Sequence, residues 1–135
     1  MALQYSEEVR NAKLDAVETA IGTSPILYIF DGTLPSDCAS ADNGTVLATV
    51  NLPSDWMAAA SSGSKAKAGT WQDSAADATG TASYFRIKDS TGTTCHIQGS
   101  VTITGSGGVM TVDNPSFGVG QVFTVTSFTI SSGNQ

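Results

Sequence analysis

The most regular pattern of hydrophobic and polar positions lies between residues 82 and 104. In its first part, 83–88, Phe85 and Ile87 point to one face of a strand, and the intervening residues point to the other face: Tyr84, Arg86 and Lys88. Alternation with a period of two predicts a strand with one dry face and one wet face. The pattern therefore places Tyr84, Arg86 and Lys88 on the wet face.

A second alternating run occupies 94–104, after a turn segment that contains Gly92. One phase of this run is apolar: Cys95, Ile97, Val101 and Ile103. The other phase is polar and includes His96, the only histidine of the chain. Two such strands joined by four or five residues are typical of a β-hairpin.

Shorter apolar runs predict further strands. The run 26–30 is apolar on both faces and indicates a central strand, while 46–52 alternates and ends at Pro53. The residues 69–71 open another short strand, and 109–112 follow a glycine-rich turn at 105–108. Strands of this length between Gly, Ser and Asn turns are typical of all-β domains.

The last strand region, 121–131, contains a change of phase. Phe123 and Val125 share one phase, whereas Phe128 and Ile130 share the opposite one. A regular strand cannot bury both pairs on one face, so we predict either a bulge near residues 126–127 or a strand that passes from one sheet to another.

Between the strands, three segments have a different composition. Residues 54–60 follow Pro53, and Ser54 or Asp55 can cap a short helical turn that leaves Trp56 and Met57 as a hydrophobic plug. The Ser, Gly, Ala and Lys of 61–68 predict a mobile loop or a subunit-contact arm, and 72–80 predicts a second loop.

One amphipathic helix is predicted at residues 6–21. Ser6 is a suitable N-cap and Gly22 can end the helix in a left-handed conformation. Its apolar stripe either covers the sheet of its own chain or docks on a neighbouring subunit. The candidate assembly interface consists of Val9, Leu14, Val17, Ile21, Trp56 and Met57.

These elements predict an all-β fold, a β-sandwich or jelly-roll-like domain with one N-terminal α-helix. A chain of 135 residues has the size of one domain. We divide it into an N-terminal helical arm, 1–24, and a β-sandwich domain, 25–135.

Charge and composition argue against two classes of partner, nucleic acids and membranes. The net charge of −6 and the six scattered basic residues argue against nucleic acid, and no apolar run is long enough for a membrane span.

Residues 1–8 lack the features of a secretory signal, so we expect synthesis in a reducing cytosol. Cys38 and Cys95 are then free, buried thiols, or one disulfide if the fold brings them together.

No constellation of residues predicts catalysis. His96 and Cys95 point to opposite faces of one strand and make a poor nucleophile–base pair, so a solvated surface histidine is expected. Asp37 and Asp42 could line a weak Ca²⁺ site, but the segment 37–44 lacks the ligand spacing of an EF-hand. We therefore expect no enzyme activity, no cofactor and no metal.

Three runs of the sequence resemble a group of small virion-associated proteins of tailed bacteriophages and prophages. They are 1–6 continuing into 9–16, the Leu-Pro-Ser-Asp-Trp-Met run at 52–57, and the Thr-Cys-His-Ile-Gln-Gly run at 94–99. The resemblance covers most of the chain. It implies a virion protein made in the host bacterial cytoplasm, and carries no catalytic residues.

Within that group, the low charge and the docking-type helix favour a capsid decoration, or cement, protein, which binds many symmetric positions on a shell. We expect self-association as a homotrimer and contact with the major capsid protein or other virion proteins. The alternative is a tail, connector or host-recognition protein that binds a cell-surface glycan. Clustering of Trp56, Trp71 and Tyr84 on one exposed patch would favour the alternative.

Overall fold

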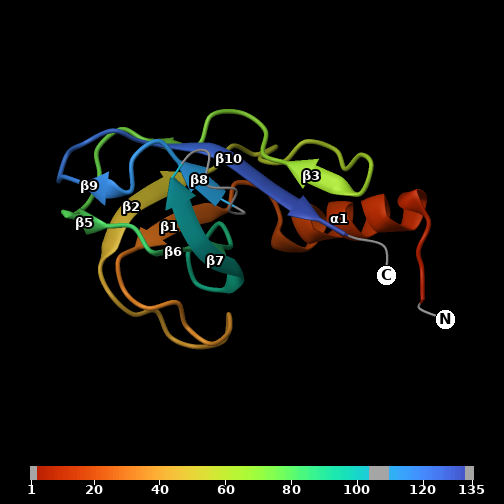
Figure 1. Cartoon of the computed structure of the whole chain (residues 1–135), viewed down its shortest axis with the longest axis horizontal. Helices are drawn as coiled ribbons and strands as arrows, with labels where there is room; N and C mark the ends of the chain where they lie inside the picture. Colours follow the sequence, from red (N-terminus) through yellow and green to blue (C-terminus); the bar gives the residue numbers. More distant parts are fainter. Residues whose placement is uncertain (1–2, 104–109, 133–135) are drawn as a thin grey trace.

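The computed structural model describes residues 3–103 and 110–132 (Figure 1). The described part contains one helix, α1 (Glu7–Ile21). The strands are β1 (Ile26–Phe30), β2 (Val46–Asn51), β3 (Ser64–Ala66), β4 (Gln72–Asp73), β5 (Gly80–Thr81), β6 (Tyr84–Lys88), β7 (Cys95–Ile103), β8 (Met110–Val112), β9 (Ser116–Phe117) and β10 (Phe123–Ser131). The predicted turn at 105–108 lies outside the described residues.

Most strands belong to one mixed sheet with the order β2-β1-β6-β7-β8-β10-β3. Neighbours are antiparallel except for β7 and β8, which are parallel. β4 pairs with β10, and β5 and β9 form a separate two-stranded sheet. The large sheet curls, while α1 lies at the far end beside β3 and the end of β10 (Figure 1). The predicted all-β fold with one N-terminal helix is confirmed.

The predicted hairpin is formed by β6 and β7. Ile87 pairs with Ile97 and Arg86 with Gln98, but a bulge follows, and Lys88 then pairs with Cys95. The extra residue is His96, which is exposed. Cross-strand partners share a face. Cys95 therefore lies on the face of Arg86 and Lys88, and its predicted place beside Ile97 is wrong because the bulge resets the phase.

The turn of this hairpin depends on Asp89. Its Oδ1 accepts hydrogen bonds from Thr91 Oγ1 at 2.7 Å and from the Thr93 backbone N–H at 3.0 Å. The bond from Thr91, followed by that from Thr93, lowers the pKa of Asp89 from 3.8 to about 2. Hydrogen bonds of this kind favour the ionised carboxylate.

Asp89 should therefore titrate near pH 2 in the folded protein. Because its folded pKa is lowered, its contribution to stability is present above the unfolded pKa of 3.8 and is lost as pH falls through about 2. NMR titration of the side-chain carboxyl carbon measures the midpoint directly. In a Thr91→Val variant, which lacks the first donor, the midpoint should move up toward 3.8; an unperturbed midpoint in the parent would contradict the assignment.

The core is built around a chain of aromatic rings. Trp56 lies 6.1 Å from Trp71, Trp71 lies 5.4 Å from Phe128, and Phe128 lies 5.6 Å from Phe85, measured between ring centroids. All four side chains are fully buried, as is Met57. The predicted plug of Trp56 and Met57 is confirmed.

The helical turn predicted at 54–60 is wrong. Met57 forms a β-bridge with Lys67, and the Ala58 N–H donates to Ala66 O at 2.8 Å. These contacts with residues 66 and 67 of the same chain hold the segment extended. For the same reason the mobile loop, one of the two alternatives predicted for 61–68, is wrong: the segment contains β3, which pairs with the end of β10. A subunit contact there stays a prediction.

The change of phase in the last strand is a bulge, which was one of the two predicted alternatives. The register of β10 against β8 shifts between Val125 and Ser127. Val125 and Phe128 can therefore both enter the core, where they are 1% and 0% exposed. Beyond the bulge, residues 129–131 pair with β3.

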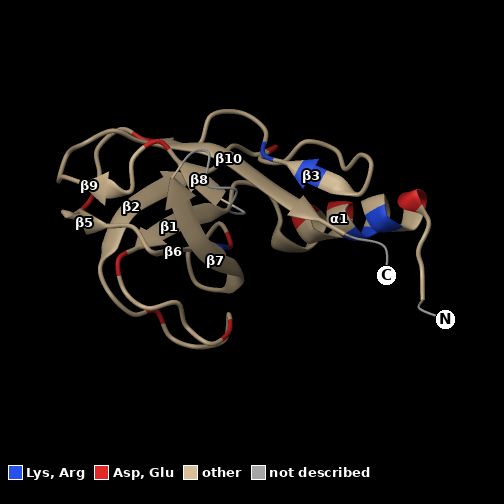
Figure 2. Ribbon diagram, in the orientation of Figure 1, with Lys and Arg blue, Asp and Glu red and all other residues tan. Residues whose placement is uncertain are grey.

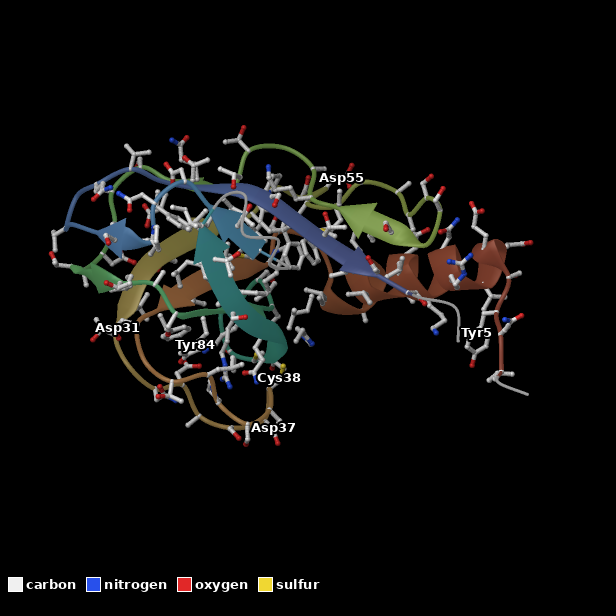
Figure 3. All side chains as sticks on the ribbon, in the orientation of Figure 1. Tyr5, Asp31, Asp37, Cys38, Asp55 and Tyr84 are labelled. Carbon is white, nitrogen blue, oxygen red and sulfur yellow. The ribbon has the colours of Figure 1, made fainter. Side chains whose placement is uncertain are left out.

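The predicted wet face of β6 is wrong. Tyr84 and Arg86 are 0% and 2% exposed, because residues 31–45, which we call the covering loop, lie over them. The hydroxyl of Tyr84 donates to Asn43 O at 2.6 Å and accepts from the Asn43 N–H at 3.1 Å. Figure 3 shows Tyr84 on the same side of the sheet as the covering-loop residues Asp37 and Cys38.

Candidate functional site

The first candidate site is the unit of α1, β3 and the end of β10. We call this unit the arm; it includes more of the chain than the helical arm predicted at 1–24. Helix α1 begins at the cap Ser6, whose hydroxyl accepts from the Val9 N–H at 3.2 Å, and ends at Gly22, with φ 93°. Leu14 and Ile21 form its buried stripe. The helix packs along β3 of its own chain (Figure 1).

A buried lysine joins the helix to β3. Lys65 is 2% exposed, and its Nζ lies 2.7 Å from Asp15 Oδ1, 2.9 Å from Glu18 Oε1 and 2.9 Å from Ala58 O. Burial opposes the charge of Lys65, but the hydrogen bonds to Asp15 and Glu18 outweigh it and raise its pKa. The hydrogen bond from Lys65 lowers the pKa of Asp15. Both groups are therefore charged at neutral pH.

Two further contacts fix the arm. At its base, Trp56 Nε1 donates to Gly22 O at 3.0 Å, so the end of α1 is tied to the core. At the turn before β3, the Gly63 N–H donates to Asn11 Oδ1 and the Ser132 N–H donates to Gly63 O, both at 2.9 Å. Gly63 has φ 75° and lies against Arg10, so a side chain at this position would clash.

The predicted interface residues divide into two groups. Leu14, Ile21, Trp56 and Met57 are buried within the chain, and Val17 is partly buried against the core. Val9 is 42% exposed. The apolar stripe of α1 thus covers its own chain, which was one of the two predicted alternatives. Contact of the helix with a neighbouring subunit stays a prediction.

The exposed apolar residues of the arm lie at its free end. Leu3 is 67%, Tyr5 37% and Val9 42% exposed. Tyr5 is held against the helix, with Lys13 Nζ 4.4 Å from its ring centroid. Figure 3 shows Tyr5 at the end of the molecule opposite the β-sheet body. Val9 was among the predicted interface residues, whereas Leu3 and Tyr5 were not, because they precede the amphipathic pattern of the helix.

The second candidate site is the anchor of the covering loop on Arg86. All five guanidinium N–H groups are used: they donate to Asp42 Oδ1 at 2.8 Å, Gln98 Oε1 at 2.9 and 3.1 Å, Ser40 O at 2.8 Å and Asp37 O at 3.0 Å. Arg86 was missed because a strand pattern shows the phase of a residue but not what covers it. An arginine between Phe85 and Ile87 near an acidic loop is the only signal.

Asp42 receives a second cation, Lys88, whose Nζ lies 2.7 Å from Asp42 Oδ2. Burial alone would raise the pKa of Asp42, but Lys88 and Arg86 outweigh it and lower the pKa. The carboxylate considered for Ca²⁺ is thus neutralised by two side chains of the protein. Asp37 Oδ1 accepts instead from the backbone and hydroxyl of Ser40, each at 2.9 Å.

The aromatic platform required by the glycan alternative does not exist. Trp56, Trp71 and Tyr84 are each 0% exposed, so none can stack on a sugar. Their apolar bodies fill the core, while their polar atoms bond within the chain to Gly22 O, Ala68 O and Asn43 O. In the described part of the chain, no group of three or more His, Cys, Asp and Glu is placed to hold a metal ion.

The six basic side chains are all engaged within the chain. Lys65, Arg86 and Lys88 form ion pairs. The remaining three contact carbonyls or rings: Arg10 on Ser132 O, Lys13 on Tyr5, and Lys67 on Gly69 O and Trp71. Apart from Asp73 on β4, the acidic residues lie on α1 and in the segments between the strands (Figure 2). No helix among the described residues has the length and apolarity to cross a bilayer.

Comparison with models of protein families, with curated proteins and with solved structures found no match to this chain.

Proposed function

We propose that this chain is a non-enzymatic structural protein of a tailed-bacteriophage virion, where it decorates the capsid as a homotrimer. The motif resemblance supports the virion setting, and the low content of charged residues, 13%, suits a protein that packs against others. The observation that carries the proposal is the arm. Leu3, Tyr5 and Val9 are exposed at its N-terminal end, and this end of the helix lies away from the β-sheet body (Figure 1).

The construction of the arm suits assembly on a shell. Lys65 ties β3 to α1, and Trp56 ties the end of α1 to the core. A contact surface that is ordered before binding loses less conformational entropy when it docks. The partner that we propose for the free end is the major capsid protein or a neighbouring subunit of the trimer. A tail or connector location is the other outcome that the experiment must distinguish.

The experiment has two steps. Light scattering of the purified protein gives its solution mass, and a trimer is expected. The protein is then mixed with heads of the phage assembled without it, and bound copies are counted after sedimentation. Copies in proportion to the capsid lattice would support decoration. Binding to tails but not to heads would move the protein to the tail, and binding to neither would contradict the virion proposal.

Val9→Asp should weaken head binding about tenfold or more, because a charge replaces an apolar contact at the free end. Leu34→Asp is the matched control: Leu34 is also 42% exposed, but lies on the covering loop. Both variants should unfold at the same urea concentration as the parent. Equal loss of binding in the two, or none in Val9→Asp, would exclude the arm as the contact surface.

A further inference from the structure

The covering loop brings together two cysteines that are far apart in the sequence. Cys38 and Cys95 are both free and half-buried, and both line one cleft beside the covering loop. The bulge of β7 turns Cys95 to the loop side of the sheet, opposite Lys88. Arg86 fixes the covering loop next to Cys38, because its Nη2 donates to the carbonyl of the preceding residue, Asp37, at 3.0 Å.

The pair is open to reagents. Both cysteines line a cleft of about 260 Å³ between the covering loop and the β6–β7 hairpin, together with Asp42, Arg86 and Lys88. The cleft continues into a wider hollow that both cysteines also line. Figure 3 shows Cys38 on the loop beneath β7, at the edge of the molecule. A small reagent can therefore reach the sulfurs without unfolding the chain.

We infer that Cys38 and Cys95 form a redox site, at which a small disulfide such as oxidised glutathione converts the thiol pair into an intramolecular disulfide. The bond ties the covering loop to the start of β7. This inference does not depend on the virion role. A protein made in a reducing cytosol carries the thiols, and exposure to an oxidising medium closes the bond.

The reaction proceeds by two exchanges. In the first, the Cys38 thiolate attacks one sulfur of oxidised glutathione, whose S–S bond breaks and releases one glutathione thiolate, which takes up a proton. In the second, Cys95 gives up its proton, its sulfur attacks Cys38 Sγ, and the second glutathione leaves. Two protein thiols are oxidised, and one glutathione disulfide is reduced to two thiols.

The order of attack follows from the environment of Cys95. Burial, followed by the influence of the neighbouring Cys38 thiol, raises the pKa of Cys95 to about 12. Cys95 is therefore almost entirely protonated at neutral pH, and a protonated thiol is a poor nucleophile. This assigns the first attack to Cys38. Iodoacetamide should accordingly alkylate Cys38 before Cys95 in the folded, reduced protein.

The test is to incubate the full-length protein with oxidised glutathione, block the remaining thiols, and digest it with trypsin without reduction. The positions of lysine and arginine place Cys38 in the peptide 14–65 and Cys95 in the peptide 89–135. We expect these two peptides to be joined, with the loss of two hydrogen atoms. Because the bond closes a long loop, the oxidised protein should melt higher by on the order of 10 °C.

The single variants Cys38→Ser and Cys95→Ser are the controls. Each should carry a glutathione adduct or a free thiol, and its melting temperature should not rise on oxidation. Relative to the chain unfolded in denaturant, the equilibrium constant for closing the bond should be larger by on the order of a thousandfold in the folded protein. Dimers linked between chains, stable glutathione adducts on the parent, or equal constants in the two states would overturn the inference.

Discussion

Replacement of Arg86 with methionine is expected to lower the free energy of unfolding by about 3–5 kcal/mol, as in other buried pairs that lose one partner. Methionine keeps an unbranched apolar stem but has no N–H group. The carbonyls of Asp37 and Ser40 and the side-chain amide of Gln98 would lose their donors, and the covering loop would lose its anchor. Urea unfolding followed by tryptophan fluorescence measures the change.

Lys88→Met is the matched control because it removes the other cation from Asp42. Lys88 donates to Asp42 Oδ2 but to no loop carbonyl, and its other contact is the Tyr28 ring, 5.3 Å from Nζ, so a loss of at most about 1 kcal/mol is expected. Similar losses in the two variants would mean that Arg86 acts as a charge and not as the anchor of the loop. Hydrogen exchange of residues 31–45 should increase only in Arg86→Met.

Features that depend on neighbouring residues could be predicted from the sequence. The cap Ser6 and the terminal Gly22 bound α1, because capping is decided within one turn of the helix. The opposite phases of Val125 and Phe128 predicted an irregularity in β10, either a bulge or a passage between sheets, because a regular strand cannot bury both side chains on one face; the structure has the bulge. The β6–β7 hairpin was predicted because two runs with alternating apolar and polar residues flank a short turn segment.

Features that depend on contacts between segments distant in the sequence could not be predicted from it. Arg86 looked exposed because it alternates with Phe85 and Ile87, yet residues 31–45 return across it. Lys65 lies in a Ser, Gly and Ala segment that has the composition of a loop, yet two carboxylates of α1 make its burial favourable. Composition indicates that a charged side chain prefers water, but a side chain that finds hydrogen-bond and charge partners in the fold can be buried.

The same distinction applies to the candidate interface. An apolar stripe such as that of Leu14 and Ile21 shows which face of a helix is buried. The stripe looks the same whether that face packs against its own chain or against another subunit. Here β3 supplies the cover. The large apolar side chains that stay exposed at the free end of the arm are Leu3, Tyr5 and Val9; of these, only Val9 lies within the helical pattern.

Trp56→Ala should be the most damaging substitution at the base of the arm, with a loss of about 3–5 kcal/mol. Trp56 is fully buried against Trp71, so alanine would leave a cavity. The Gly22 carbonyl, at the end of α1, would lose the donor Nε1. Thermal or urea unfolding, followed by the fluorescence of the remaining Trp71, measures the loss.

Trp56→Phe separates the two contributions, because phenylalanine keeps most of the ring but has no N–H group. Its loss should be about 1–2 kcal/mol, the range for a buried acceptor left without its donor. If Trp56 acted instead at a subunit contact, both variants would change the solution mass while each monomer kept the stability of the parent. Loss of stability in proportion to the removed ring volume, at constant oligomeric state, assigns Trp56 to the core and removes it from the candidate assembly interface.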